Sequence, residues 1–138
     1  MPEKPLRQLI EETRVYYDSI GRVKSKILNS YVHFTAEGKR HLLYKGNRKK
    51  RSVKEQRYKL NLFPLVIPVL KQSTSIQDWR FPEGHDENEE DVQYYAVVCD
   101  VGKQKISVRV IVMRTGDGQI NYHSVMKHKA PNHKKKPR

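Results

Sequence analysis

Three side chains of one short segment have types and a spacing that could serve phosphodiester chemistry. Glu37, His41 and Lys45 follow one another at intervals of four residues, so on a helix they form a single stripe. An imidazole with a carboxylate behind it and an ammonium ahead can transfer a proton while the cation stabilises an anion. The stripe is equally typical of an ordinary solvated helix face, and residue types alone do not separate these two interpretations.

The elements around this stripe follow from its neighbours. Residues 31–34 alternate polar-tipped and apolar side chains, which predicts a half-buried strand. Thr35 can cap a helix that has Glu37 in its first turn, and Gly46 can end it. We therefore predict a strand followed by a helix from Thr35 to Lys45.

The first half of the chain is expected to be helical elsewhere as well. Residues 5–19 have an amphipathic pattern and predict a first helix. The apolar residues of 22–29 fit neither the helical period nor the strand period, so this segment is assigned to a connection. Ser52, with Glu55 three residues later, predicts a capping box at the start of another helix. Residues 73–82 and the acidic segment 83–91 are predicted to be loops.

Prolines divide the apolar run that follows. Because Pro64 and Pro68 lack an N–H group, we expect one helix to about Leu62 and a second, buried helix from Pro64 to Lys71. The residues expected to pack against the sheet are Leu62, Phe63, Val66, Ile67 and Leu70.

The last third of the chain is rich in Val, Ile and Tyr and predicts three strands, at residues 92–101, 105–114 and 119–127. In the last of them, strict alternation places Ser124 on the same face as Tyr122 and opposite to His123. The fold class is α+β, with N-terminal helices packed on one face of a C-terminal antiparallel β-meander of three to four strands. Residues 1–127 form a single domain in this interpretation, and residues 128–138 form a basic, disordered tail.

The composition points to a polyanionic partner. The chain has 28 Lys and Arg against 15 Asp and Glu, a formal net charge of +13, which favours RNA or DNA as a ligand. No long apolar segment or lipidation signal suggests a membrane. Cys99 is the single cysteine, which fits a cytoplasmic location, and the scattered histidines predict neither a metal site nor a cofactor.

Metal-free RNA cleavage needs a base for the 2′-hydroxyl proton, a cation for the charged phosphorane and an acid or solvent for the leaving 5′-oxygen. The sequence offers all three residue types. His33 on a strand is nonetheless more often a hydrogen-bonded, half-buried residue than a catalyst, and Ser124 is as readily a polar residue that fills a space on the sheet. The basic run 48–51 suits phosphate binding but specifies no reaction by itself.

The order of these elements resembles the barnase, EndoU, colicin-type and RelE-like (BECR) superfamily of metal-independent ribonucleases. Residues 33–45 are similar to the strand and histidine-bearing helix that open the phage and mobile-element members, and residues 122–125 are similar to their closing strand. The resemblance implies that His41 is the main acid/base residue, that Lys45 and Arg51 are phosphate ligands, and that Ser124 contacts a phosphate or a base. By residue type, His33 and His123 are candidates for the second proton-transfer group. The candidate catalytic residues are therefore His41, Lys45, His33, Ser124 and His123. The net charge and the basic cluster predict RNA-phosphate contacts from Arg40, Arg48, Lys49, Lys50 and Arg51. The resemblance implies that Lys59 and Arg114 add positive charge for phosphate binding.

The sequence therefore predicts a metal-independent endoribonuclease that cleaves RNA by 2′-hydroxyl attack, with a toxin-like role as one option. Its RNA could be tRNA or mRNA, and an acidic antitoxin or immunity protein could be a partner. The alternative is a non-catalytic basic RNA-binding or regulatory protein, in which tyrosines on the open sheet face stack on bases.

Overall fold

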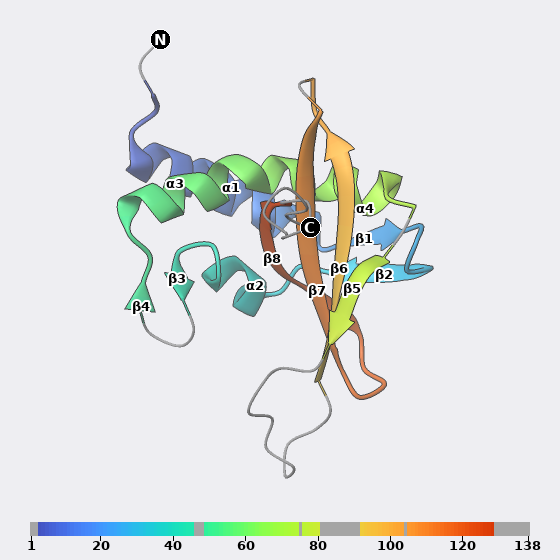
Figure 1. The fold of residues 1–138 in the computed structure, drawn as a ribbon. Coiled ribbons are helices and arrows are strands. Elements are labelled where there is room, and N and C mark those ends of the chain that lie inside the picture. Colours follow the sequence, from blue (N-terminus) through green and yellow to red (C-terminus); the bar gives the residue numbers. More distant parts are fainter. Residues whose placement is uncertain (1–2, 46–48, 75, 81–91, 104, 129–138) are drawn as a thin grey trace, which may run out of the picture.

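A computed structural model describes residues 3–45, 49–74, 76–80, 92–103 and 105–128 of the chain. In these residues the main feature is a six-stranded sheet with helices on one side (Figure 1). Its strands, in spatial order, are β1 (Arg22–Ser25), β2 (Ser30–His33), β8 (Ile120–Lys127), β7 (Ile106–Thr115), β6 (Val92–Val101) and β5 (Ile76–Arg80). All neighbouring strands are antiparallel except β2 and β8, which run parallel.

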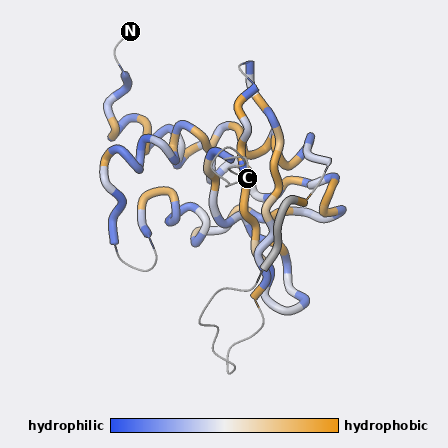
Figure 2. The backbone as a smooth tube through the Cα atoms, viewed as in Figure 1, coloured by the Kyte–Doolittle hydropathy of each residue, from blue (hydrophilic) through white to orange (hydrophobic). Residues whose placement is uncertain are grey.

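The helical layer comes from the first half of the chain. Its elements are α1 (Leu6–Ile20), α2 (Ala36–Arg40), α3 (Val53–Leu62), a 3-10 turn (Phe63–Leu65) and α4 (Val66–Gln72). α4 packs across β6 and β7, while α3 lies beside β8 and also contacts α1. The tube in Figure 2 shows apolar residues along β6 and β7, whereas the short strand β4 (Lys49–Lys50) is hydrophilic.

The α+β class is confirmed, with helices from the first half and an antiparallel-dominated sheet completed by the second half. The capping box at Ser52 is present, because its hydroxyl accepts from the Glu55 amide while the Glu55 carboxylate accepts from the Ser52 amide. The sheet is larger than a three- to four-stranded meander, because β1, β2 and β5 extend it at both edges. Residues 22–25 and 76–80, which were assigned to connections, are strands held by backbone pairing.

The helix predicted from Thr35 to Lys45 is wrong in its second half. Thr35 caps α2 through a hydrogen bond from the Gly38 amide, but α2 ends at Arg40. The amides of Leu42 and Leu43 bond three residues back rather than four, and the chain then enters a hairpin of β3 (Tyr44–Lys45) and β4. Burial of Leu42, which is 3% exposed, accompanies this tightening of the backbone. Gly46 lies outside the described residues.

The core lies between the helices and the sheet. Tyr17 stacks on Phe63 and Phe34 stacks on Tyr122, each with ring centroids 5.2 Å apart. Val108, Val110 and Val112 of β7 are fully buried beneath α4. Of the five residues expected to pack here, Leu62, Phe63, Val66 and Leu70 are buried, and Ile67 is only partly buried.

Truncation of Leu70 tests this packing. Leu70 is 0% exposed on α4, so Leu70→Ala should lower the free energy of unfolding by about 2–5 kcal/mol through lost burial and a residual cavity. Urea titration followed by circular dichroism measures the change. Val15→Ala is the matched control, because Val15 is 57% exposed on α1 and such surface changes usually stay within about 0.5 kcal/mol. Equal effects of the two substitutions would contradict the placement of α4.

Candidate active site

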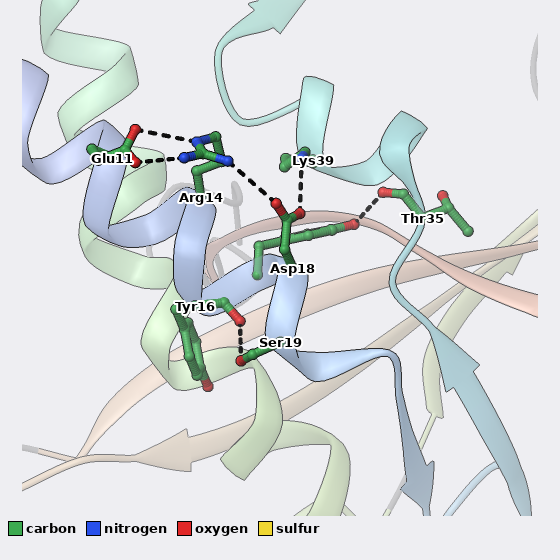
Figure 3. A network of polar contacts seen from close by, with 8 residues as sticks. Glu11, Arg14, Tyr16, Asp18, Ser19, Thr35 and Lys39 are labelled. Atoms are coloured by element: carbon green, nitrogen blue, oxygen red, sulfur yellow. Dashed lines mark hydrogen bonds and ion pairs between the residues drawn. The ribbon is translucent and has the colours of Figure 1, made fainter.

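Helix α2 is fixed to α1 by a polar network. The Tyr17 hydroxyl donates to the Thr35 carbonyl over 2.6 Å, and Lys39 donates to Asp18 over 2.8 Å. Asp18 also pairs with Arg14 one turn earlier on α1, as Figure 3 shows. These contacts set the position of the residue that follows α2, which is His41.

Gly38 lets α2 approach the sheet. A Cβ atom at this position would lie 2.6 Å from both the Tyr122 carbonyl oxygen and the Tyr17 hydroxyl, which is closer than van der Waals contact allows. Only glycine therefore permits this docking of α2 against β8. A glycine inside a predicted helix is the sequence signal for such a close approach.

A β-bulge in β8 presents two polar residues on one face. Ile111 of β7 pairs with Ser124, but the next residue, Val112, pairs with Tyr122, so His123 has no partner in the ladder. Tyr122 and Val125 are buried in the core, which leaves His123 and Ser124 on the face away from the helices. The strict alternation predicted for this strand is therefore wrong at Ser124.

His41 and His123 meet over this bulge. Their ring centroids are 4.4 Å apart, and Nε2 of His41 lies 3.4 Å from Oε2 of Glu37. The His41 side chain is 15% exposed. Burial is the main cause that lowers the pKa of His41 below its ordinary value; the Glu37 carboxylate opposes this shift, and nearby Arg40, Arg51 and Lys59 add to it.

His123 is the more buried of the two imidazoles. Burial, and then the neighbouring His41, lower its pKa to about 4, so it is neutral at physiological pH. Its Nδ1 atom is buried and makes no hydrogen bond to any residue that the structure describes. His123 therefore suits a role as a neutral surface for the His41 ring better than a role as a proton donor.

Lys59 brings a buried ammonium to the same place. This residue is 8% exposed, and its Nζ donates to the Val125 carbonyl over 2.6 Å and to the Ser124 hydroxyl over 3.1 Å. Burial, and then repulsion by Arg51, lower the pKa of Lys59 to about 8. A predicted phosphate contact such as Lys59 is expected to be solvated, whereas this side chain is buried.

The free edge of β8 explains why Lys59 is buried. In the described chain β2 pairs with β8 only at Ile120 and Asn121, so the later residues of β8 are paired with β7 on one side and have no strand on the other. Helix α3 covers that edge instead. Lys59 supplies a donor to the Val125 carbonyl, and the Tyr58 hydroxyl accepts from the Lys127 amide over 2.7 Å. Side chains thus satisfy backbone groups that a neighbouring strand would otherwise pair.

Two arginines flank the cluster. Arg51 directs its Nε to the His41 carbonyl over 2.9 Å, which ties the start of α3 to the end of α2. Arg40 donates to Oε2 of Glu37 over 2.9 Å, and this bond is the largest cause of the lowered pKa of Glu37. The site thus holds Glu37 as a carboxylate beside His41.

Other predicted residues lie away from the cluster. Lys45 lies on β3 and not on the helix that was predicted to align it with His41. Its ammonium pairs with Glu55 over 3.2 Å. Arg114 shares the face of Val112, on the helix side of the sheet, and donates to the Gly116 carbonyl. Neither residue contributes to the site.

The remaining predicted residues have simple positions. His33 is on β2 with Asn121 as its register partner, so it lies on the same sheet face as His123 but on the next strand. Lys49 and Lys50 are exposed on β4. Arg48, the acidic segment 83–91 and residues 129–138 of the predicted tail are outside the described residues.

Comparison of the chain with protein-family models, with curated proteins and with solved structures found no match. Within the described ranges, no three His, Cys, Asp or Glu side chains gather as a potential metal site. No helix in this part of the chain is long and apolar enough to cross a membrane.

Proposed function

We propose that this protein is a metal-independent endoribonuclease that cleaves RNA by attack of the 2′-hydroxyl group on the neighbouring phosphate. The observation that carries the proposal is the convergence of His41 with the buried ammonium of Lys59 at the β8 bulge. An imidazole with a lowered pKa and a desolvated cation are the two groups that this reaction needs most.

His41 acts as the general base. Its Nε2 faces Glu37, which orients the ring, so the other ring nitrogen takes the 2′-hydroxyl proton. The O2′–P bond forms, the P–O5′ bond breaks, and water protonates the departing 5′-oxygen. The products are a 2′,3′-cyclic phosphate and a 5′-hydroxyl end.

Lys59 and Ser124 stabilise the phosphorane. The ammonium is held by the Val125 carbonyl and the Ser124 hydroxyl, so little reorganisation is needed when negative charge develops on the phosphate. The Ser124 hydroxyl accepts from Lys59 and can donate its own proton to a phosphate oxygen. Arg51 adds a second positive charge beside His41.

Cleavage of a single-stranded RNA in EDTA tests the activity. Intact protein should release products that end in 2′,3′-cyclic phosphate, identified by mass spectrometry, with a rate that EDTA leaves unchanged. A substrate with one 2′-deoxy position should resist cleavage at that position only. Loss of cleavage in EDTA, or cleavage at the 2′-deoxy position, would contradict the mechanism.

The approach path for RNA is predicted to involve Lys49 and Lys50. Each phosphate contact with single-stranded RNA contributes about 0.7 to the slope of log affinity against log salt, through counterion release. The double variant Lys49→Ala/Lys50→Ala should therefore lower the magnitude of this slope by about 1.4. Fluorescence anisotropy between about 50 and 200 mM salt measures it.

Lys103→Ala is the control for this change, because Lys103 is exposed in the turn between β6 and β7. It should leave the slope unaltered. Equal slopes for wild type and the double variant would remove β4 from the binding surface.

A non-catalytic RNA-binding protein is the second candidate function. The observation that favours it is the exposed pair Lys49 and Lys50, together with a net charge of +13, because these features bind phosphates without any reaction. Salt-dependent binding with no cleavage by wild type would establish this alternative.

A further inference from the structure

A row of side chains crosses the open sheet face next to the catalytic cluster. Tyr94 of β6 pairs with Met113 of β7, and Met113 pairs with Asn121 of β8. Their neighbours in the ladder, Tyr95 and Val112, face the core. The row therefore lies on the opposite face, and the proposed cleavage reaction uses none of its three residues.

This row is continuous with the site. The Tyr94 ring meets the edge of His123, with centroids 5.0 Å apart and planes at 65°, and His123 in turn contacts His41. Three rings therefore run without a gap from the general base to β6. An RNA phosphate at His41 and Lys59 places the adjoining nucleotide over this part of the sheet.

The chemistry of the row matches a nucleobase. An aromatic ring stacks on any base, and a methionine thioether packs adaptably beside it. Asn121 uses its Oδ1 to accept from Gln119 over 2.8 Å, which leaves its amide nitrogen to donate to a base. Unstacked bases of single-stranded RNA are read by this combination of stacking and edge hydrogen bonds.

We propose that Tyr94, Met113 and Asn121 form a nucleobase subsite, in which the base adjoining the scissile phosphate stacks on Tyr94 and accepts a hydrogen bond from Asn121. The proposal rests on the proposed function for the position of the phosphate. It gives the site a preference for single-stranded RNA, because a paired base cannot enter the row.

A double-mutant cycle, which combines Tyr94→Ala with removal of one base from the probe, tests the contact between Tyr94 and that base. The probes are 2′-fluoro hexanucleotides, which lack the attacking hydroxyl, with one position at a time made abasic. For wild type, loss of the base at one position should weaken binding by roughly 5- to 150-fold, the range for one stacked base. In Tyr94→Ala, removal of the base at that position should not weaken binding further. In Tyr94→Phe, which keeps an aromatic ring, it should weaken binding as in wild type.

Tyr16→Ala is the matched control, because Tyr16 is a 38% exposed tyrosine on α1, in the helical layer. It should keep the position-specific penalty of wild type. Identical penalties in wild type and Tyr94→Ala, or no position-specific penalty in wild type, would overturn the subsite. Because the probes cannot be cleaved, this result is independent of the RNA cleavage assay, whose failure would overturn the proposed function alone.

Discussion

His41→Ala should slow RNA cleavage by about 10²–10⁴-fold, the usual contribution of a positioned general base. RNA affinity should fall only slightly, because the cations that bind phosphate remain. The fold should persist, since His41 follows α2 and is not one of the buried residues that form the hydrophobic core cluster. Single-turnover cleavage rates, with binding and melting temperature measured in parallel, separate these effects.

Free imidazole provides the sharpest control for this variant. If the side chain transfers a proton, imidazole added to His41→Ala should restore part of the cleavage rate. The restored rate should rise with the concentration of neutral imidazole. A purely structural role would give no rescue. Full activity in His41→Ala would remove this residue from the mechanism.

The pH dependence of wild type provides a second measurement. A base must be neutral to accept a proton, and the pKa of His41 is lowered from 6.5 chiefly by burial. The acidic limb of kcat/KM should therefore lie below pH 6.5. A limb above that value would mean that another group is the base.

Local patterns predicted the elements that depend on neighbouring residues. The capping box at Ser52 and the proline at position 64 act within one or two turns, so α3 and the change of helix after it were visible in the sequence. The three C-terminal strands were also found, because their apolar runs are bounded by short turns.

The site itself depended on contacts that no local pattern contains. Lys45 was expected beside His41 because both fit a helical stripe, but burial of Leu42 and the β3–β4 hairpin end the helix first. Lys59 has a residue type that is normally solvated. Its burial comes from the unpaired edge of β8, which is determined by how far β2 extends along that strand.

Lys59→Met should lower cleavage by about 10²–10³-fold, the effect of removing one preorganised donor to a developing oxyanion. Methionine has a similar length and leaves the helix propensity of α3 nearly unchanged. The expected loss therefore reflects the missing charge and not a missing volume.

The stability of this variant should stay close to that of wild type or rise. The pKa of Lys59 falls from 10.5 to about 8 on folding, so the unfolded chain binds more protons between these values and stability increases as pH rises from 8 to 10.5. At pH 7 the lowered pKa means that the charge on Lys59 destabilises the folded state relative to the unfolded chain. Removing it offsets the loss of the Val125 hydrogen bond, which costs about 1–3 kcal/mol.

The alkaline limb of the pH–rate profile distinguishes catalysis from packing. In wild type, kcat/KM should fall as pH rises through about 8, because Lys59 loses its charge there. The residual activity of Lys59→Met should lack this limb and keep the acidic limb of His41. If the melting temperature of the variant fell well below that of wild type but RNA were cleaved at the wild-type rate, Lys59 would have only a structural role at the edge of β8. Lower activity with an unchanged melting temperature and no alkaline limb would instead identify its ammonium as the group that stabilises the phosphorane.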